Sequence, residues 1–331
     1  MHIAEIQAPQ KIVYREAEMP QCADDEVVIE VQASGICGTD VHIFEGDYVG
    51  GYPIVPGHEF SGVIVETGSN VTRLAKNNRV AVEPNISCGN CDFCFENKQH
   101  MCRNWQAVGV LRQGGMAQYV AVPETAVFDI GDLDFEIAAF MEPLSCVLHG
   151  IKLAHIPMGS RVVVLGAGPI GMLILRVLRL QGVANIDVLE RNEGRKNCAQ
   201  AEGCRVFSDL EEVPEQYYDV VIDASGALAL EERAPYLVRP TGTVLLFGVP
   251  PQNKKIEIEP FYFFKNEITL LASFTSLRNS LQALALLQSK SVRVDDIISH
   301  RLKLSELEKG ITLMQERTDP SLMKVMLYPQ E

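Results

Sequence analysis

One stretch of this sequence restricts the fold more than any other: a short apolar run, a cluster of glycines and a longer apolar run. Residues 161–165 read Arg-Val-Val-Val-Leu, and the glycines Gly166, Gly168 and Gly171 then give the spacing G-x-G-x-x-G. Residues 172–180 continue as an apolar helix. A strand, a tight turn and a helix in this order are typical of a dinucleotide-binding βαβ unit, in which the helix start faces the phosphates.

An acidic residue at the end of the next apolar run supports a dinucleotide. Residues 186–189 are mostly apolar and end at Glu190, within the distance expected of a ribose-binding acid. Its carboxylate can accept hydrogen bonds from both ribose hydroxyls and would repel a 2′-phosphate. Arg191 follows directly and could instead hold such a phosphate. We expect NAD rather than NADP, and a βαβ unit without a ligand is the alternative.

Length, charge and cysteine content limit the class of protein. A chain of 331 residues is long enough for about two domains. The net charge of −14 argues against a nucleic-acid partner. We expect no membrane span and no secretory signal, hence a cytoplasmic protein, because no apolar run is long enough and the first residues lack a basic segment before an apolar core. Nine cysteines in that compartment indicate metal binding or buried thiols rather than disulfides.

The pattern of strands and helices changes along the chain. Residues 1–125 read as short strands separated by glycine-rich turns, which predicts an irregular antiparallel β domain. Residues 135–155 carry a helical pattern that we expect to break at Pro143. From Arg161 onward six apolar runs alternate with helical patterns, which predicts an α/β doubly wound parallel sheet. The expected strands are 161–166, 185–190, 204–207, 219–224, 243–249 and 267–273.

The last part of the chain does not continue this alternation. Two helices are expected at 277–288 and 304–316, with strands near 297–302 and 323–327. We expect these elements to return to the first domain. The predicted organisation is therefore a catalytic domain of residues 1–145 and 276–331, with a dinucleotide-binding domain of residues 146–275 inserted into it.

Four cysteines lie close together in the run CGNCDFCFENKQHMC. Three are spaced by two residues and the fourth follows after seven; they are Cys88, Cys91, Cys94 and Cys102. A tetrahedral zinc site needs four thiolates within a few ångströms, and such a loop supplies them. In the usual iron–sulfur run the fourth cysteine follows after three residues and precedes proline, whereas Arg103 follows here. We predict a structural zinc, with unliganded thiols as the alternative.

A second group of metal-binding residue types is dispersed along the chain. Cys37 lies in the segment GICGTDVH, His58 and Glu59 lie in PGHEF, and Glu142 lies in MEPLSC. Singly, each has an ordinary structural interpretation: a small buried thiol, a core histidine or a carboxylate at a helix start. Spacing alone leaves a shared metal site and these structural roles equally open.

Taken together, these segments resemble one protein family. The motifs CGTDVH, PGHEFSG, the four-cysteine loop, GGMAQYV, MEPLSC, GAGPIG and DASGA occur in the order found in zinc-dependent medium-chain dehydrogenases, and most resemble the polyol branch, typified by sorbitol dehydrogenase. The resemblance covers essentially the full length. It implies a β-rich GroES-like catalytic domain, a Rossmann domain, one catalytic and one structural zinc per subunit, NAD, a small alcohol substrate and a homodimer or homotetramer.

The resemblance also implies roles for the dispersed residues. The catalytic zinc would be held by Cys37, His58 and an acidic ligand. Glu59 and Glu142 are the acidic candidates, one in direct contact with the metal and the other acting through water, and the sequence leaves open which is which. The fourth position would stay open for the alcohol.

Further roles follow from the same resemblance. Thr39 and His42 match a proton relay, with a turn hydroxyl and a solvated side chain as the alternatives. The residues implied to contact the cofactor are Gly166, Gly168, Pro169, Ile170, Gly171, Glu190, Arg195, Phe247, Gly248, Val249, Phe274 and Thr275. The apolar members of this group have packing at strand ends as their alternative.

The substrate is the least determined property. Ile43, Phe44 and Glu142 are expected to line its pocket. The sorbitol dehydrogenases carry a tyrosine where this chain has Ile43, and an arginine–tyrosine pair where it has Thr275 and Ser276. We therefore expect a different alcohol, polyol or polyol phosphate, although no basic cluster marks a phosphate site. A threonine dehydrogenase, which shares the Ile43 type of residue, and a non-catalytic NAD-binding sensor or structural protein are the alternatives.

Overall fold

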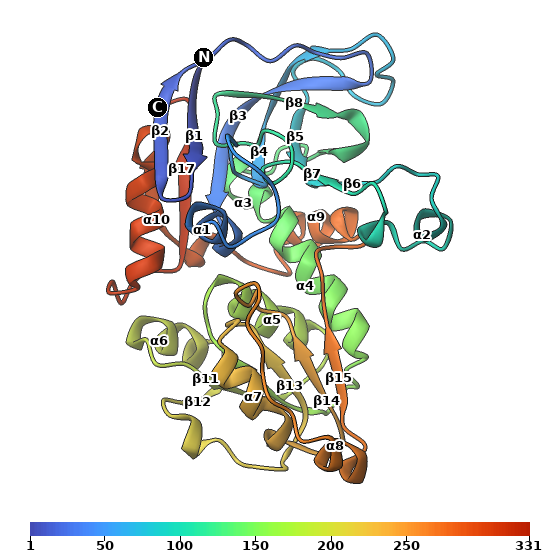
Figure 1. The fold of residues 1–331 in the computed structure, drawn as a ribbon, viewed down its shortest axis with the longest axis vertical. Helices are drawn as coiled ribbons and strands as arrows, with labels where there is room; N and C mark the ends of the chain where they lie inside the picture. The colour runs from blue at the N-terminus through green and yellow to red at the C-terminus, as the bar shows by residue number, and fades with distance from the viewer. The chain divides into compact units, whose positions relative to one another are not determined.

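The chain folds into two compact units. The computed structural model describes residues 1–331, and the units are Met1–Ser145 with Thr275–Glu331, and Cys146–Phe274 (Figure 1). The predicted boundary after residue 145 coincides with the observed one, and the predicted boundary after residue 275 lies one residue late. The chain passes from the first unit to the second within helix α4 (Met141–Ala154).

The second unit contains a six-stranded parallel sheet of the order β12-β11-β10-β13-β14-β15. This order confirms the predicted doubly wound sheet. It reverses between β10 and β13, the point at which such sheets bind ligands at the carboxyl ends of their strands. The strands are β10 (Arg161–Leu165), β11 (Asn185–Leu189), β12 (Arg205–Phe207), β13 (Tyr218–Asp223), β14 (Val238–Leu246) and β15 (Thr269–Ala272). The helices are α5 (Pro169–Leu180), α6 (Glu193–Ala201), α7 (Leu228–Leu237) and α8 (Pro260–Asn266).

Burial of strand side chains explains the apolar runs in the second unit. Val162 to Leu165 are fully buried, as expected of a parallel strand covered on both faces. Between β12 and β13 only a three-residue 3₁₀ turn, Leu210–Glu212, intervenes, as the short connection predicted. The one large polar ring in this core, Tyr218, donates its hydroxyl to Asp187 Oδ2 at 2.7 Å, and burial raises the pKa of its phenol.

The first unit is built around a seven-stranded sheet with the order β16-β17-β3-β4-β5-β9, in which β8 also pairs with β3. Its C-terminal strand β17 pairs antiparallel with β3, which confirms that the end of the chain returns to the first domain. The strands are β1 (His2–Ala8), β2 (Lys11–Glu16), β3 (Glu26–Ile36), β4 (Glu59–Thr67), β5 (Arg79–Val82), β6 (Asn85–Ile86), β7 (Gln106–Ala107), β8 (Tyr119–Pro123), β9 (Val127–Asp129), β16 (Ile298–Lys303) and β17 (Lys324–Tyr328). The helices are α1 (Gly38–Glu45), α2 (Asp92–Phe95), α3 (Phe135–Ala139), α9 (Ser280–Gln288) and α10 (Leu307–Glu316).

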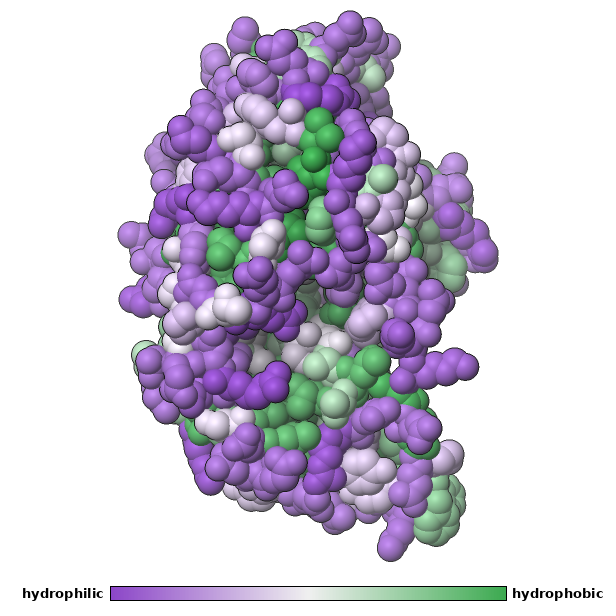
Figure 2. All heavy atoms as spheres, turned by 60° about the vertical axis from the view of Figure 1, so that its left-hand side comes forward, coloured by the Kyte–Doolittle hydropathy of each residue, from purple (hydrophilic) through white to green (hydrophobic).

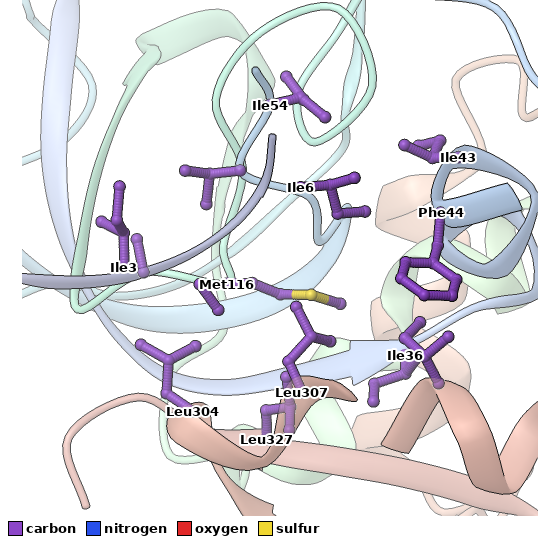
Figure 3. Packing of buried hydrophobic residues seen from close by; sticks show 14 of the residues in the cluster. Ile3, Ile6, Ile36, Ile43, Phe44, Ile54, Met116, Leu304, Leu307 and Leu327 are labelled. Carbon is purple, nitrogen blue, oxygen red and sulfur yellow. The ribbon is translucent and has the colours of Figure 1, made fainter. Parts of the chain in front are cut away.

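One apolar cluster of the first unit joins segments from both ends of the sequence. Ile6 of β1 and Ile36 of β3 pack with Leu307 of α10 and Leu327 of β17, and each side chain is at most 1% exposed (Figure 3). Burial of this kind contributes about 25 cal/mol per Å² of apolar surface. The cluster therefore holds the returning C-terminal segment against the N-terminal one.

The helical stretch at residues 135–155 differs from its prediction in one detail. The break lies at Phe140, between α3 and α4, and the predicted break at Pro143 is wrong. Pro143 occupies the first turn of α4, where a missing backbone N–H breaks no helical hydrogen bond. Residues 135–154 are long and apolar enough to cross a membrane by composition, but 78% of their most apolar window is buried inside the protein, as in a core helix. The molecular face in Figure 2 is largely hydrophilic, with scattered hydrophobic patches.

A buried carboxylate also connects the two segments of the first unit. Glu83, just after β5, is 9% exposed, and its Oε2 accepts hydrogen bonds from the hydroxyls of Ser276 at 2.7 Å and Ser280 at 2.8 Å. Its Oε1 accepts a bond from the backbone N–H of Asn85 at 3.3 Å.

Replacing this carboxylate should destabilise the first unit. In Glu83→Ala the two serine hydroxyls lose their acceptor in a buried place, so the free energy of unfolding should fall by about 2 kcal/mol. Urea denaturation of zinc-loaded protein measures this change. The matched variant Glu308→Ala alters an exposed side chain of α10 and should leave the free energy of unfolding within about 0.5 kcal/mol of its original value. Equal effects of the two substitutions would contradict the assignment.

Candidate active site and metal centres

A single buried carboxylate organises the dispersed metal-binding residues of the first unit. Asp40, on the first turn of α1, is completely buried, and its Oδ2 accepts a hydrogen bond from the backbone N–H of Cys37 at 2.8 Å. Its Oδ1 accepts a bond from the N–H of Gly57 at 3.3 Å and lies 3.6 Å from Nδ1 of His58. Asp40 thereby fixes the start of α1 beside the segment that leads into β4.

Three side chains meet in this place with the donor atoms of a metal site. The thiol sulfur of Cys37, a ring nitrogen of His58 and a carboxylate oxygen of Glu59 all lie within 4.8 Å of one another. Sulfur, nitrogen and oxygen donors are the ligands that zinc takes in proteins, and three protein ligands leave a fourth position open, as in catalytic sites. Because Asp40 faces Nδ1 of His58, the other ring nitrogen remains for the metal.

The structure separates the two acidic candidates. Glu59 belongs to the group of three donors, whereas Glu142 does not. Glu142 is 8% exposed and lies in the first turn of α4. The geometry therefore favours Glu59 as the direct metal ligand and places Glu142 outside the group, consistent with an action through water.

The charges around His58 favour a cation. Burial by itself lowers the pKa of its imidazole, but the carboxylate of Asp40 and the thiol of Cys37 outweigh this effect and raise the pKa well above its ordinary value. Negative groups that stabilise an imidazolium also stabilise a divalent cation. The residues present thus fit a zinc ion.

The predicted relay residues lie on successive turns of α1. Thr39 is 8% exposed, and its side chain forms a hydrogen bond with the side chain of Tyr48. Burial raises the pKa of the Tyr48 phenol. His42 is more exposed, at 19% of its side chain, with Nδ1 3.9 Å from Oδ2 of Asp47. The helix therefore leads from a buried hydroxyl to a ring near the surface.

Two predicted substrate contacts belong to the hydrophobic core. Ile43 and Phe44 are 4% and 9% exposed and pack into the cluster with Ile36, as Figure 3 shows. They lie one turn beyond Thr39 and Asp40 on α1, so the helix presents these two apolar side chains to the core. Core packing accounts for both, and the structure gives no support for their assignment to the substrate pocket.

The four-cysteine loop also has the geometry of a metal site. The sulfur atom of Cys102 lies 3.4 Å from that of Cys88 and 3.8 Å from that of Cys91, and the sulfur atoms of Cys91 and Cys94 are 3.5 Å apart. Four sulfurs around zinc at about 2.3 Å form a tetrahedron with edges of about 3.8 Å. Hydrogen bonds from the backbone N–H groups of Arg103 and Cys94 lower the pKa of the Cys91 thiol to about 6, which favours the thiolate that zinc requires.

The glycine motif of the second unit has the expected local structure. Gly166 adopts a left-handed conformation with φ of +104°, and a Cβ atom on Gly171 would lie 2.1 Å from the carbonyl oxygen of Gly166. Helix α5 begins at Pro169 with Gly168 at its N-cap, followed by Ile170, and no side chain caps its first N–H groups. These groups can therefore bind a phosphate.

Glu190 lies beside this loop. Its Oε2 accepts a hydrogen bond from the backbone N–H of Ala167 at 2.9 Å, and its Oε1 accepts bonds from the N–H groups of Arg191 and Asn192, each at 2.8 Å. Arg195 of α6 reaches the same place, because a Cβ atom on Gly168 would lie 3.7 Å from its Nη1. The acid, the arginine and the glycine loop are thus brought together.

The other predicted cofactor contacts are strand ends. Phe247, Gly248 and Val249 follow β14, and a Cβ atom on Gly248 would lie 2.1 Å from the N atom of Gly226. Val249 and Phe274 are 44% and 38% exposed, so the protein covers both side chains only in part. Thr275 has a φ of +50°, and its buried hydroxyl makes no hydrogen bond. A strained conformation of this kind in a β-branched residue points to a functional constraint.

Comparison with known proteins identifies the family. Residues 23–132 match the alcohol dehydrogenase GroES-like domain, and residues 169–289 match the zinc-binding dehydrogenase domain. The chain is 34% identical to D-altritol 5-dehydrogenase of Agrobacterium fabrum strain C58, over 98% of both chains. This chain is a zinc-dependent medium-chain dehydrogenase.

Two further comparisons support this placement. The dehydrogenase is 31% identical to D-arabinitol dehydrogenase 1 of Uromyces fabae, over 95% of this chain and 93% of that one. Its fold matches a crystal structure, described as a zinc-binding dehydrogenase of Sinorhizobium meliloti 1021 bound to NADP, with a TM-score of 0.92, 34% identity and 99% coverage of both chains. The predicted family, fold class and enzyme class are therefore confirmed.

Sequence reasoning missed three residues of the dehydrogenase site. Asp40 lies between two residues that were singled out, and its position three residues after Cys37 is the spacing of a helix-start capping box, which could have indicated it. Tyr48 follows α1 and carries no motif of its own. Lys324 starts the last strand and lies next to Glu59. No local sequence pattern predicts this contact.

Loss of one thiolate from the four-cysteine loop should release one metal ion. The dehydrogenase as isolated should contain two zinc ions per chain, and Cys91→Ser should retain one. Because a structural zinc orders its loop, proteolysis within residues 85–107 should become faster by about ten-fold. Atomic absorption and limited trypsin digestion measure both effects. Cys198→Ser, which alters a thiol of α6, should change neither, and a Cys91 variant that keeps two zinc ions would contradict the site.

Glu190 should set the choice of dinucleotide. In Glu190→Ser the partners of the ribose hydroxyls are removed together with the charge that repels a 2′-phosphate, so NADH should bind about ten-fold more weakly and NADPH should bind as well or better. Fluorescence titration gives both dissociation constants. Glu193→Ser, at an exposed position of α6, should leave them unchanged. An unaltered ratio of the NADH and NADPH dissociation constants in the Glu190 variant would show that this carboxylate does not contact the ribose.

Proposed function

We propose that this dehydrogenase oxidises a secondary hydroxyl of a polyol, a sugar alcohol or its phosphate to a ketone, with NAD as the hydride acceptor. The observation that carries this proposal is the group of three mixed donors, Cys37, His58 and Glu59, in one chain with a dinucleotide loop. A metal site with a position left open has no use in a non-catalytic sensor, so this set favours turnover.

The chemistry follows from the residues around the donors. A zinc ion held by Cys37, His58 and Glu59 would act as a Lewis acid that lowers the pKa of the bound hydroxyl. Thr39 would relay the proton of that hydroxyl, accepting it while giving up its own, since it lies two residues after Cys37 at the start of α1. His42 on the next turn can carry the proton toward solvent. NAD, held at the glycine loop and the start of α5, would supply the hydride acceptor for the substrate carbon.

The polar groups near the donors limit the substrate. Ser276, in one of the positions where sorbitol dehydrogenases carry polyol-binding residues, donates its hydroxyl to Glu83 and is used for packing. We propose that Tyr48 and Glu142, which lie near the donors, contact a second hydroxyl of the substrate. The relatives that are named for altritol and arabinitol support a polyol of this kind. Relatives named L-threonine 3-dehydrogenase support the rival substrate.

The preference for NAD rests on Glu190, which is held beside the glycine loop by three backbone N–H groups. Arg191 next to it could serve NADP, and the similar Sinorhizobium structure is described as bound to NADP. We infer NAD because a carboxylate at this position repels a 2′-phosphate.

We also propose that the dehydrogenase is a cytoplasmic homodimer or homotetramer without a nucleic-acid or membrane partner. All nine cysteines are free thiols, which suits a reducing compartment. Strand β15 forms an edge of the second unit's sheet, and its Leu270 is 37% exposed. Phe261 and Phe264 on α8 are 66% and 79% exposed, and apolar groups of this size are commonly covered by a partner subunit.

The activity can be tested directly. NADH formation should be measured with NAD or NADP and a panel of pentitols, hexitols, their phosphates, small diols and L-threonine, with and without a zinc chelator. We expect chelator-sensitive oxidation of a polyol or polyol phosphate with NAD. Cys37→Ser should lower kcat/KM by at least about a thousand-fold, because one ligand of the Lewis acid is lost. Cys198→Ser should keep full activity.

Other outcomes assign other functions. Turnover of L-threonine without polyol turnover would establish the rival dehydrogenase. NAD binding without turnover of any alcohol would favour a sensor or structural protein. Turnover that survives in Cys37→Ser would overturn the mechanism.

A further inference from the structure

Three neighbouring strands of the first unit bring a lysine to the metal ligands. Strand β17 begins at Lys324 and pairs with β3, where Val325 lies opposite Ile36 and Met326 lies opposite Gly35. On the other side of β3, Gly35 lies opposite Glu59, the first residue of β4. The sheet register therefore places Lys324 two strands away from Glu59, with β3 between them.

The side chains of Lys324 and Glu59 meet across this gap. The ammonium group of Lys324 forms an ion pair with Oε2 of Glu59, and the two residues are only 5% and 2% exposed. The contact depends on Gly35, because a Cβ atom there would lie 2.6 Å from both Oε2 of Glu59 and Cε of Lys324. The lysine chain thus passes over a residue that has no side chain.

The start of β17 is itself held in place. The hydroxyl of Ser299 on β16 donates a hydrogen bond to the carbonyl of Lys324 at 3.2 Å and accepts one from the N–H of Met323 at 2.9 Å. Nε2 of His300 lies 3.1 Å from Oδ2 of Asp319, which fixes the preceding loop. The lysine therefore extends from an anchored backbone, and this anchoring limits the freedom of its side chain.

A buried lysine of this kind has a cost that must be offset. Isolated ammonium groups are expelled from protein interiors unless they are paired and hydrogen-bonded. Here the nearby negative groups are Glu59 in direct contact, with Cys37 and Asp40 beyond it. Each of these belongs to the metal site or orients it, so the lysine is part of the same buried group of charges.

We propose that Lys324 is a positioning residue that limits Glu59 to one metal-binding oxygen. The ammonium group occupies Oε2, so only the other carboxylate oxygen is available to zinc. Carboxylates can otherwise bind a metal through both oxygens. Glu59 held in this way fills one coordination position, and the position needed by the alcohol stays open. The proposal rests on the proposed zinc-dependent function but concerns the metal site itself.

The test is the coordination of cobalt in place of zinc. In Lys324→Met the carboxylate of Glu59 is free to bind through both oxygens, so the coordination number should rise. The visible absorption of Co²⁺ at this site should then fall about two-fold, because four-coordinate Co²⁺ absorbs more strongly than five-coordinate Co²⁺. Cobalt can also bind at the four-cysteine loop. The spectrum of Cys37→Ser, which lacks one ligand of the other site, measures that contribution as a baseline. Lys309→Met, an exposed change on α10, should leave the spectrum unaltered.

A second pair of variants isolates the carboxylate. The amide of Glu59→Gln offers one good oxygen donor and cannot bind through two, so its cobalt absorption should remain high. Adding Lys324→Met to Glu59→Gln should then produce no further change. The double variant removes the carboxylate together with its ammonium partner, so it tests the proposal even if Lys324→Met alone fails to fold: any change relative to Glu59→Gln would show that the lysine acts through another group.

Several results would overturn the proposal. An unchanged cobalt spectrum in folded Lys324→Met would show that the lysine does not control Glu59. A spectral change of equal size in the Glu59→Gln background would show that it acts through another group. The proposed function fails separately, if the unaltered protein oxidises no alcohol, and the cobalt result would still stand.

Discussion

The metal site of this dehydrogenase depends on the carboxylate of Asp40, which binds three groups from two segments of the chain. Hydrogen bonds to the N–H groups of Cys37 and Gly57 hold the start of α1 beside the start of β4, and the same carboxylate faces Nδ1 of His58. Without this carboxylate, no side chain would hold the thiol of Cys37 and the imidazole of His58 in fixed positions relative to each other. A buried acceptor of this kind is effective because each of its bonds lies in a low-dielectric surrounding.

The metal site gathers negatively charged groups in the protein interior, and their charge must be offset. Cys37, Asp40 and Glu59 place several negative groups in a buried volume, and the protein offsets them with Lys324 and with the metal it is built to hold. Charges buried without partners are far more costly than those at the surface. Metal binding and the stability of the first unit are therefore linked, in the sense that the ion completes the charge balance of the folded state.

Much of the fold could be predicted because its signals are local. The six parallel strands read as apolar runs, and the glycine spacing at Gly166 and Gly171 reports a turn that few other residues could form. The helix break was misplaced because proline in a first turn is tolerated, so Pro143 carried less information than assumed. The side-chain direction of Ile43 and the proximity of Lys324 to Glu59 depend on packing and on strand register between distant segments. No pattern in a single sequence specifies these directly.

The position of strand β17 at the end of the chain affects how the protein folds during its synthesis on the ribosome. The strand lies between the edge strand β16 and β3 in the first unit's sheet, yet it is synthesised after the whole second unit. The nascent chain can complete its Rossmann unit early, since domains tend to fold in the order of synthesis. The catalytic unit must wait with an open gap beside β3. Contacts between such distant segments are slow to form, so we expect nascent chains to expose this gap until the last strand has been made.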